Sequence, residues 1–390
     1  MNELDSEIMV GELEERGMER IEEEEKADLL LFNTCSIRDL AERKVMGKIG
    51  RLGRGEEKTQ LIGVTGCMAN AKKDTLFKKL PHIDFVVGTN NIHNLNEVLD
   101  DRLATGKQQI RTDDEFSFEL DYLKAKRDNP VSAHISIIRG CDKYCTYCVV
   151  PYTRGPEVSR TPESILEEVK ALADKGYKEI FLLGQNVNSY GNDKPEWNTK
   201  FHDLLYSIDK IPGIERVRFM TSHPVDISFQ LMEAIRDLRT VCEFVHFPMQ
   251  AGSPRILKKM HRIYTIEQYL EKVAMLKSMV PDIALGTDII VGFPTETEEE
   301  FQETLALLDR VQFDAVYAFA YSPRPGTRAA KMVDDVPVSV KKDRLNRLLQ
   351  HQLQVAEGSY ARRVGKKMEI LVEGESKNQK MAKENEKVWM

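Results

Sequence analysis

Residues 139–148, which read RGCDKYCTYC, place Cys141, Cys145 and Cys148 within eight positions. Thiolates are soft ligands that hold iron–sulfur clusters or zinc, and close spacing lets one loop wrap a single centre. Three thiolates on a four-iron cluster leave one iron open, and an open iron is available for chemistry. The triplet therefore predicts an iron–sulfur cluster with a reactive site.

Zinc and disulfides are the alternatives for these cysteines. A structural zinc site needs a fourth ligand, normally from a second Cys or His pair at short spacing, and the sequence shows no such pair. A disulfide framework is typical of small secreted domains. This long chain has six cysteines, and its first residues lack the pattern of a signal peptide. A cluster is therefore favoured over both alternatives.

The composition is that of an ordinary soluble globular protein, with 41% hydrophobic and 31% charged residues. Apolar runs stay short of the roughly 18 residues that a membrane helix needs, so we expect a cytoplasmic protein without a membrane segment. The net charge of −7 argues against a generic nucleic-acid binder. Local basic groupings nevertheless permit a phosphate-contacting face; they lie at Arg51–Arg54, Arg324–Lys331, Lys341–Arg347 and Arg362–Lys367.

The first 115 residues alternate between helix and strand patterns, which predicts a parallel sheet with helices on its faces. Helix patterns cover 3–16 and a segment capped by Ser36, and buried-strand runs lie at 29–32, 61–64 and 85–87. Cys35 and Cys67 come directly after two of these strands, at the carboxyl edge where open α/β sheets place ligands. A buried structural cysteine is the alternative at each position.

A linker over 116–133 leads to a second alternating series. Its strands are expected at 134–138, 179–183, 216–220, 244–247, 284–291 and 315–321, and its helices at 162–175, 227–238, 266–279, 296–311 and 338–357. Six strand–helix units predict an open barrel related to the eight-unit form, whose chemistry lies at the carboxyl ends of its strands. The cysteine loop follows the first strand. Residues 367–373 alternate like one further strand.

Polar residues follow the other predicted barrel strands and favour a ligand pocket over ordinary loops. They read GQNVN at 184–188, TSHP at 221–224, PMQAG at 248–252, GFP at 292–294 and SPR at 322–324. Asp288 and His246 lie within strands, where each is either a pocket group or a satisfied polar group of the core. Cys242 matches no ligand position, and we expect it to be structural.

Over nearly its whole length the chain resembles the radical S-adenosylmethionine (SAM) methylthiotransferases, and among them the members that modify tRNA. The triplet continues into VVPYTRG at 149–155, which is typical of the tRNA enzymes and usually differs in relatives that modify a ribosomal protein. Further matches are FMTSHP at 219–224, DIIVGFP at 288–294 and YSPRPGT at 321–327. Together these motifs are far more specific than a cysteine triplet alone.

The resemblance implies an α/β fold in three parts. An N-terminal open parallel α/β domain covers 1–115, and after the linker a partial TIM-type (β/α)6 radical SAM barrel covers 134–357. Residues 358–390 resemble the beginning of a TRAM domain, the small β-barrel that grips tRNA, but form only a short, incomplete β segment.

The resemblance also implies SAM and two 4Fe-4S clusters as cofactors. Cys141, Cys145 and Cys148 would hold the catalytic cluster, at which SAM is cleaved to methionine and a 5′-deoxyadenosyl radical. Cys35 and Cys67 would hold an auxiliary cluster that delivers sulfur. Matching positions place Tyr147 near the adenine of SAM, Gln185 and Asn186 at its methionine part, and Gln250 and Asp288 at its ribose.

The implied reaction adds a methylthio group to C2 of N6-isopentenyladenosine beside the anticodon. Its partners would be a tRNA anticodon stem-loop and an electron donor such as flavodoxin or ferredoxin, and the protein would act as a monomer. Two alternatives remain. One is the same chemistry on threonylcarbamoyladenosine tRNA or on a ribosomal protein, and the other is a non-catalytic iron–sulfur protein that binds RNA.

The N-terminus departs from the family pattern. The family binds its auxiliary cluster with three cysteines, the first in a Gly-Cys-x-Met-Asn-x-x-Asp-Ser-Glu motif, whereas this chain begins MNELDSE, just inside that motif. The first ligand and the first strand are thus missing. We expect either a truncated or misassigned start, or a protein without auxiliary-cluster function.

Overall fold

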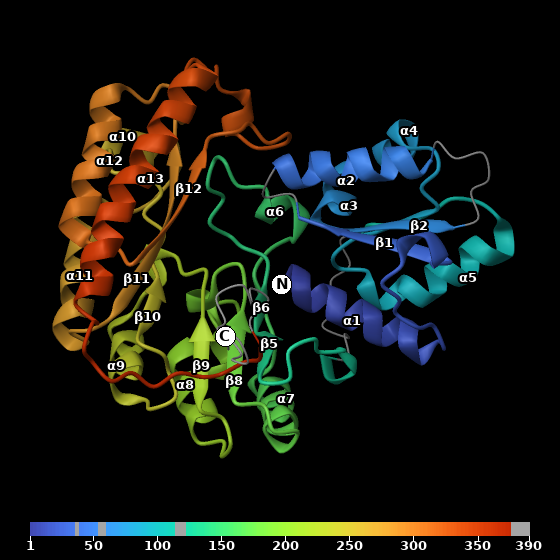
Figure 1. Cartoon of the computed structure of the whole chain (residues 1–390), viewed down its shortest axis with the longest axis horizontal. Helices are drawn as coiled ribbons and strands as arrows, with labels where there is room; N and C mark the ends of the chain where they lie inside the picture. Colours follow the sequence, from blue (N-terminus) through green and yellow to red (C-terminus); the bar gives the residue numbers. More distant parts are fainter. Residues whose placement is uncertain (36–38, 54–59, 114–121, 376–390) are drawn as a thin grey trace, which may run out of the picture.

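The computed structural model describes residues 1–35, 39–53, 60–113 and 122–375. Two α/β units lie side by side, and the larger one carries the cysteine loop (Figure 1). The three larger sheets have only parallel pairings within the described residues. This confirms the parallel α/β class that the alternating pattern predicted.

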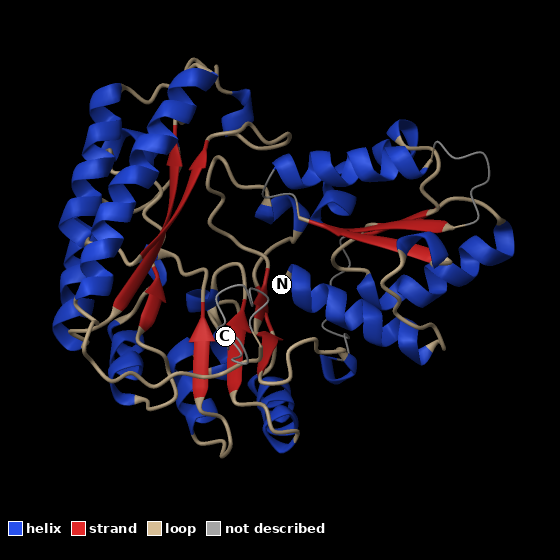
Figure 2. Cartoon of the chain, in the orientation of Figure 1, coloured by secondary structure: helices blue, strands red, loops and turns tan. Residues whose placement is uncertain are grey.

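The N-terminal unit is a four-stranded sheet in the order β1-β2-β3-β4 with helices on both faces (Figure 2). Its strands are β1 Leu29–Thr34, β2 Leu61–Gly66, β3 Phe85–Val87 and β4 Gln109–Arg111, and its helices are α1 Asn2–Glu15, α2 Asp39–Leu52, α3 Cys67–Lys72, α4 Thr75–Lys79 and α5 Leu95–Thr105. Phe85 and Val87 pack with α1 and α5, whereas Val86 packs with α2 and α3. This alternation buries both faces of the sheet.

The larger unit contains six barrel strands in two sheets, β5-β8-β9 and β10-β11-β12, with helices around them (Figure 2). Val217 in the first sheet forms a parallel bridge with Val241, which lies just before the second sheet. The strands are β5 Ser132–Ser136, β8 Glu179–Leu183, β9 Arg216–Phe219, β10 Phe244–His246, β11 Ala284–Val291 and β12 Ala315–Ala320. One continuous core joins the inner faces of the helices to the strands, as expected for an open barrel.

Within the described residues, seven helices of six or more residues surround the barrel strands, and short 3-10 turns lie in the loops of both units. The helices are α7 Pro162–Asp174, α8 Phe201–Asp209, α9 Phe229–Asp237, α10 Pro254–Lys259, α11 Ile266–Met279, α12 Glu298–Val311 and α13 Val338–Ala361. The turns are η1 Glu24–Lys26, η2 Ile92–Asn94, η3 Tyr122–Lys124, η4 Val187–Ser189, η5 Pro195–Trp197, η6 Pro224–Asp226 and η7 Ala329–Lys331.

Most of the predicted barrel elements are observed within two residues of their expected ends, and β8, β11 and α11 match at both ends. The first barrel strand is shifted toward the N-terminus. It ends at Ser136 because the chain turns at Ile137 into β6 (Ile138–Arg139), which pairs antiparallel with β7 (Val158–Ser159). The cap expected at Ser36 lies outside the described residues.

The strand expected over 367–373 is not formed in the described part of the chain. After α13 this segment runs across the amino-terminal side of the barrel (Figure 1). Arg216 Nη2 donates to the carbonyl of Glu369 at 3.0 Å, and Asn129 Nδ2 donates to Glu373 Oε2 at 2.7 Å. Met368 and Ile370 are 62% and 76% exposed. The alternating pattern was misleading because a strand also needs a paired neighbour and a core to face.

None of the helices in the described ranges is long and apolar enough to cross a membrane.

Candidate active site

The cysteine loop leaves the barrel after β6 and is closed by α6 (Val150–Thr153). Gly140 opens the loop with a φ of +79°, and a Cβ atom there would lie 1.7 Å from the carbonyl oxygen of Pro156. The amide of Cys141 donates to the carbonyl of Gly155 at 3.2 Å. Position 140 therefore excludes a side chain both by its left-handed backbone and by close approach. This glycine fixes where the first cysteine enters the site.

The middle of the loop is held by segments far away in the sequence. The amide of Thr146 donates to the carbonyl of Met260 at 3.0 Å, and its carbonyl accepts from the amide of Ala329 at 2.8 Å. Arg262, which is 7% exposed, directs Nη1 to Cys145 Sγ at 3.5 Å. Hydrogen bonds to a ligand sulfur tune the potential of a cluster. Arg262 therefore belongs to the immediate surroundings of the cysteine triplet.

The three thiols suit a cluster better than a single metal ion. Cys141, Cys145 and Cys148 are all partly buried. Across the described ranges, no three or more His, Cys, Asp or Glu side chains are arranged to hold one metal ion. In a four-iron cluster each thiolate binds a different iron, so the sulfurs lie farther apart. Burial raises the pKa of Cys141 and that of Cys148 to about 12. A bound cationic centre would keep both as thiolates.

The strand-end loops around the triplet carry backbone strain. Four residues other than glycine have positive φ after β6, β9, β10 and β11: Tyr144 at +47°, Thr221 at +66°, Gln250 at +72° and Thr295 at +72°. Such conformations cost about 1–3 kcal/mol each and cluster at functional sites. In η4, Asn188 Nδ2 is buried without a hydrogen-bond partner among the described residues. The carboxyl edge of the barrel thus offers the polar, strained surroundings that fit a polar cofactor.

Gln185 and Asn186 lie at this edge, and both contact neighbouring loops. Gln185 Oε1 accepts a hydrogen bond from the amide of Gly140 at 2.5 Å, which fastens the start of the cysteine loop. Asn186 is 2% exposed. Its Nδ2 donates to Asp226 Oδ2 at 2.7 Å, and its Oδ1 accepts from the amide of His223 at 3.0 Å. In this structure the two amides therefore support the loops of the site.

Gln250 and Asp288 lie on neighbouring segments, since the amide of Gln250 donates to the carbonyl of Asp288 at 2.9 Å. The side chain of Asp288 is 33% exposed and lies 3.4 Å from Nε2 of His246, which is buried. Asp288 is thus accessible to a ligand, whereas His246 is an interior group. Tyr147 packs against the main core. Burial raises its pKa well above the ordinary tyrosine value.

Cys35 and Cys67 leave adjacent strands at the same height, because Thr34 pairs with Gly66 in the register of β1 and β2. Cys67 is buried at the first residue of α3, which packs against α6 of the cysteine loop. The high pKa of Cys148 arises mainly from burial, with contributions from Cys145 and, more weakly, Cys67. Cys67 therefore lies close enough to Cys148 to affect its pKa.

A buried ion network joins α1 to the cysteine loop. Asp5 Oδ2 lies 2.7 Å from Arg154 Nη2, and Asp5 Oδ1 lies 3.5 Å from Arg139 Nη2. The three side chains are between 1% and 4% exposed. Burial lowers the pKa of Arg154, but Asp5 and, more weakly, Cys67 raise it above its ordinary value. Since Arg139 and Arg154 flank the triplet in sequence, the network ties the N-terminal unit to both ends of the loop.

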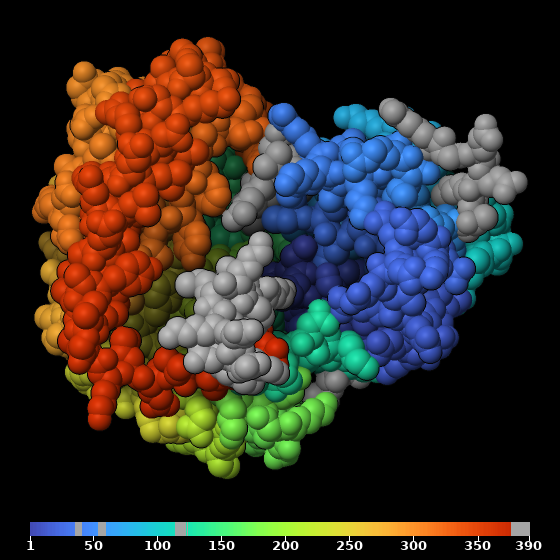
Figure 3. All heavy atoms as spheres, viewed as in Figure 1, coloured from blue at the N-terminus to red at the C-terminus, as the bar shows by residue number. Residues whose placement is uncertain are grey.

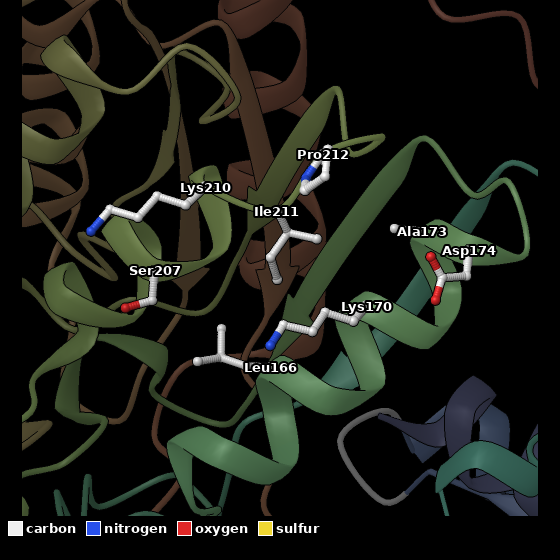
Figure 4. A pocket seen from close by; sticks show the side chains of 8 residues that line it. All are labelled: Leu166, Lys170, Ala173, Asp174, Ser207, Lys210, Ile211 and Pro212. Atoms are coloured by element: carbon white, nitrogen blue, oxygen red, sulfur yellow. The ribbon is translucent and has the colours of Figure 1, made fainter.

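A separate pocket of about 430 Å³ lies between α7 and α8 (Figure 4). Its lining residues are Leu166, Lys170, Ala173, Asp174, Ser207, Lys210, Ile211 and Pro212. The carboxyl ends of α7 and α8, which border it, lead into the amino ends of β8 and β9. Barrel chemistry lies at the opposite, carboxyl ends of the strands. This pocket is therefore not the active site.

Sequence reasoning missed Arg262, Asp5 and Arg154. Arg262 is 117 residues from Cys145, and no local spacing links the two. Arg154 lies within the matched VVPYTRG segment, and that membership was its only sequence signal. Asp5 is the aspartate of Asp-Ser-Glu in the family's N-terminal motif, but nothing in that motif points to its two arginine partners, which are brought to it only by tertiary packing.

Two family profiles match the chain. The profile of the Radical SAM superfamily matches residues 135–308, which include the cysteine triplet. The profile described as "Uncharacterized protein family UPF0004" matches residues 1–88, which include Cys35 and Cys67.

Two curated relatives cover most of the chain and carry the same name, tRNA-2-methylthio-N(6)-dimethylallyladenosine synthase. The chain is 68% identical to the protein from Protochlamydia amoebophila (strain UWE25), over all of its own length and 87% of the relative's. It is 50% identical to the protein from Thermoanaerobacter pseudethanolicus (strain ATCC 33223 / 39E), over 97% of its own length and 81% of the relative's.

Among solved structures, the radical S-adenosylmethionine methyltransferase TsrM from Kitasatospora setae is similar with a TM-score of 0.59 and 15% sequence identity. The match covers 84% of this chain and 72% of that chain. At this identity the likeness shows the fold alone, and it agrees with the predicted radical SAM barrel.

Proposed function

Because this chain belongs to the family of the tRNA-2-methylthio-N(6)-dimethylallyladenosine synthases, which are radical SAM enzymes, we propose that it adds a methylthio group to C2 of N6-isopentenyladenosine in tRNA. The observation that carries this proposal is the cysteine loop after the first barrel strand, in a chain 68% identical to a synthase of that name. The relatives' shared name does not favour the threonylcarbamoyladenosine, ribosomal-protein and non-catalytic alternatives.

Cys141, Cys145 and Cys148 would hold a 4Fe-4S cluster with one open iron, where SAM would bind. When bound, this cluster supplies the electron that cleaves SAM to methionine and a 5′-deoxyadenosyl radical. The chain's own contribution is to position the three thiolates. Gly140 sets the start of the loop, and Arg262 donates to Cys145 Sγ.

The SAM-binding roles of the strand-end residues are proposals that their surroundings support to different degrees. Asp288 is partly exposed beside Gln250, so these two side chains would bind the ribose hydroxyls. Tyr147 lies within the cysteine loop, packs against the main core and would contact the adenine. Gln185 and Asn186 already bond to neighbouring loops, so they would shape the methionine side mainly by holding those loops in place.

We propose Cys35 and Cys67 as ligands of an auxiliary 4Fe-4S cluster in the N-terminal unit. Their equal height on adjacent strands and the packing of α3 against α6 support this assignment. The printed sequence has no cysteine before Cys35, so a third cysteine ligand is not assigned. Arg154, which is bonded to Asp5 and whose pKa Cys67 helps to raise, would offset the negative charge of Cys67.

The remaining assignments complete the proposal. The tRNA anticodon stem-loop would be the part that enters the site, a flavodoxin or ferredoxin would supply electrons, and the protein would act as a cytoplasmic monomer. The functional division would be 1–115 for the auxiliary cluster, 116–133 as linker, 134–357 for radical chemistry and 358–390 for contacts to tRNA.

The substrate assignment is tested by offering the cluster-reconstituted protein three anticodon stem-loop RNAs with SAM and reductant. One carries isopentenyladenosine, one threonylcarbamoyladenosine and one unmodified adenosine. Mass spectrometry of the digested RNA should find the methylthio nucleoside from the first RNA only. Modification of the threonylcarbamoyl RNA would contradict the assignment. Formation of 5′-deoxyadenosine without any methylthio product would show a working barrel without working sulfur delivery.

A further inference from the structure

Two exposed tyrosines stand beside the cysteine loop without a role in the site described above. Tyr144 precedes the second cysteine and is 45% exposed, and Tyr152 lies in α6 and is 53% exposed. Their ring centroids are 6.3 Å apart, with an angle of 75° between the ring planes. We propose that Tyr144 and Tyr152 form a stacking platform for an unpaired base of the substrate RNA next to the nucleotide that reacts. This inference rests on the proposed tRNA substrate.

Tyr144 is held in place at a cost to the backbone. Its φ of +47° is unusual for a bulky residue, and such strain persists only where the surroundings enforce it. The carbonyl of Tyr144 accepts a hydrogen bond from Arg328 Nη2. Two residues further on, the backbone of Thr146 bonds to Met260 and Ala329. The loop therefore turns the aromatic ring outward and fixes it there, although burial would remove more apolar surface from water.

Tyr152 is equally well anchored. The adjacent Thr153 is 3% exposed. Its carbonyl accepts hydrogen bonds from Asn70 Nδ2 at 2.9 Å and from Thr89 Oγ1 at 3.1 Å, both in the N-terminal unit. The Tyr152 amide donates to the carbonyl of Val149 at 3.0 Å. Tyr144 thus projects from inside the triplet and Tyr152 from the helix after it, and the backbone at both positions is held by hydrogen bonds. A preorganised aromatic pair loses little conformational freedom when it binds a flat ligand.

The chemistry around the two rings favours RNA over a protein partner. Protein-binding patches are usually contiguous and apolar, whereas Tyr144 is bordered by the exposed cation Arg328, with exposed Lys331 on the same short turn. Aromatic faces beside cations are the usual site for an unpaired base and its phosphate. Nearby Tyr264 is buried in the core, and the partly buried Tyr147 packs against that core. Tyr144 and Tyr152 are therefore the aromatic side chains of this loop and helix that an RNA base can reach.

The test compares RNA binding by Tyr144→Ala, Tyr152→Ala and the matching Phe variants, all as cluster-reconstituted full-length protein. Affinity for an isopentenyladenosine stem-loop is measured by fluorescence anisotropy, and affinity for a blunt RNA duplex of equal length is measured in parallel. Loss of one stacked base weakens binding about 5- to 140-fold, so each Ala variant should lose that much for the stem-loop. The Phe variants keep an aromatic face and should stay within about twofold of the unchanged protein.

Leu353→Ala is the control for the loss of an exposed apolar side chain. Leu353 is 65% exposed on α13, next to Gln352, whose Nε2 donates to the carbonyl of Phe313 just before β12 at 2.8 Å. It therefore lies at the amino end of the barrel, away from the triplet, and its removal should not change stem-loop affinity. Iron and sulfide content show whether each variant has loaded its clusters. Tyr152 lies outside the triplet, so Tyr152→Ala keeps the test valid if Tyr144→Ala fails to load.

Three results would overturn the platform. The first is unchanged stem-loop affinity in a loaded Tyr152→Ala variant. The second is an equal loss for stem-loop and duplex, since a duplex has no unpaired base to stack. The third is weakened binding of reduced flavodoxin with unchanged RNA binding, which would assign the surface to a protein. Because binding is measured without turnover, a failed methylthiolation assay would reject the proposed function and leave this test intact.

Discussion

The ion network around Asp5 gives the sharpest prediction about stability. Asp5→Asn keeps the side-chain shape but removes the carboxylate that faces Arg154 at 2.7 Å and Arg139 at 3.5 Å. Because all three side chains are almost fully buried, the substitution removes a negative charge that offsets two guanidinium charges in the interior. Breaking a buried ion pair by removing one partner typically costs about 3–5 kcal/mol. We expect a loss of this size in the free energy of unfolding.

Urea unfolding followed by circular dichroism measures the effect. With a slope of about 1–3 kcal/mol per M for a domain-sized transition, the midpoint of the transition that releases the N-terminal unit should fall by about 1 M or more. Asp100→Asn is the matched control, because Asp100 pairs with Arg16 on the surface. That variant should unfold like the unchanged protein. Equal midpoints for Asp5→Asn and the unchanged protein would refute the network as a stabilising link.

The same network predicts a dependence on pH. Burial alone would raise the pKa of Asp5, but Arg154 and Arg139 outweigh it and hold the pKa below the ordinary value of 3.8. The stabilisation is therefore fully present above pH 3.8 and is lost as pH falls through the lower folded-state pKa. The difference in unfolding free energy between the unchanged protein and Asp5→Asn should shrink in that acidic range. A difference that stays constant down to the pH of acid unfolding would contradict the assigned ionisation.

Two further substitutions test the cysteine loop. Gly140→Ala must shift the loop, because its Cβ would lie 1.7 Å from the carbonyl oxygen of Pro156, so the iron content should fall by about one cluster. Gly155 has a similar φ of +77° but nothing within 4 Å of its Cβ position, so Gly155→Ala should lose only about 1 kcal/mol of stability and keep its iron. Equal iron loss in both variants would reject the close-contact argument. Arg262→Gln removes the donor to Cys145 Sγ and should lower the free energy of unfolding by about 1–3 kcal/mol. The reduction potential of the cluster, measured by spectroelectrochemical titration, should become more negative. An unchanged potential would show that this hydrogen bond does not act on the cluster.

Much of the fold could be predicted from the sequence because its strands are short apolar runs between recognisable helix patterns. β8 and β11 were placed at their observed ends in this way. The same reasoning failed at 367–373, where an alternating pattern has no paired strand. It also misplaced the first barrel strand by two residues, since the turn at Ile137 follows from the pairing of β6 with β7.

The candidate site shows the same division between local and tertiary information. Cysteine spacing identifies the triplet, and position after a strand brings Cys35 and Cys67 to one edge. Arg262 and Asp5 act through contacts that cross more than a hundred residues, and no local pattern carries such contacts. Gln185 was expected to face a ligand, but its contact with the amide of Gly140 becomes visible only when both loops are placed.

The central claim is that SAM cleavage at the cysteine loop drives methylthiolation of tRNA. The most direct test measures 5′-deoxyadenosine and the methylthio nucleoside in the same reaction for the unchanged protein, Cys148→Ala and Cys242→Ala. Cys242 matches no ligand position and lies just before β10. We predict both products from the unchanged protein and from Cys242→Ala, and neither from Cys148→Ala. Methylthio nucleoside formed by Cys148→Ala would contradict the account.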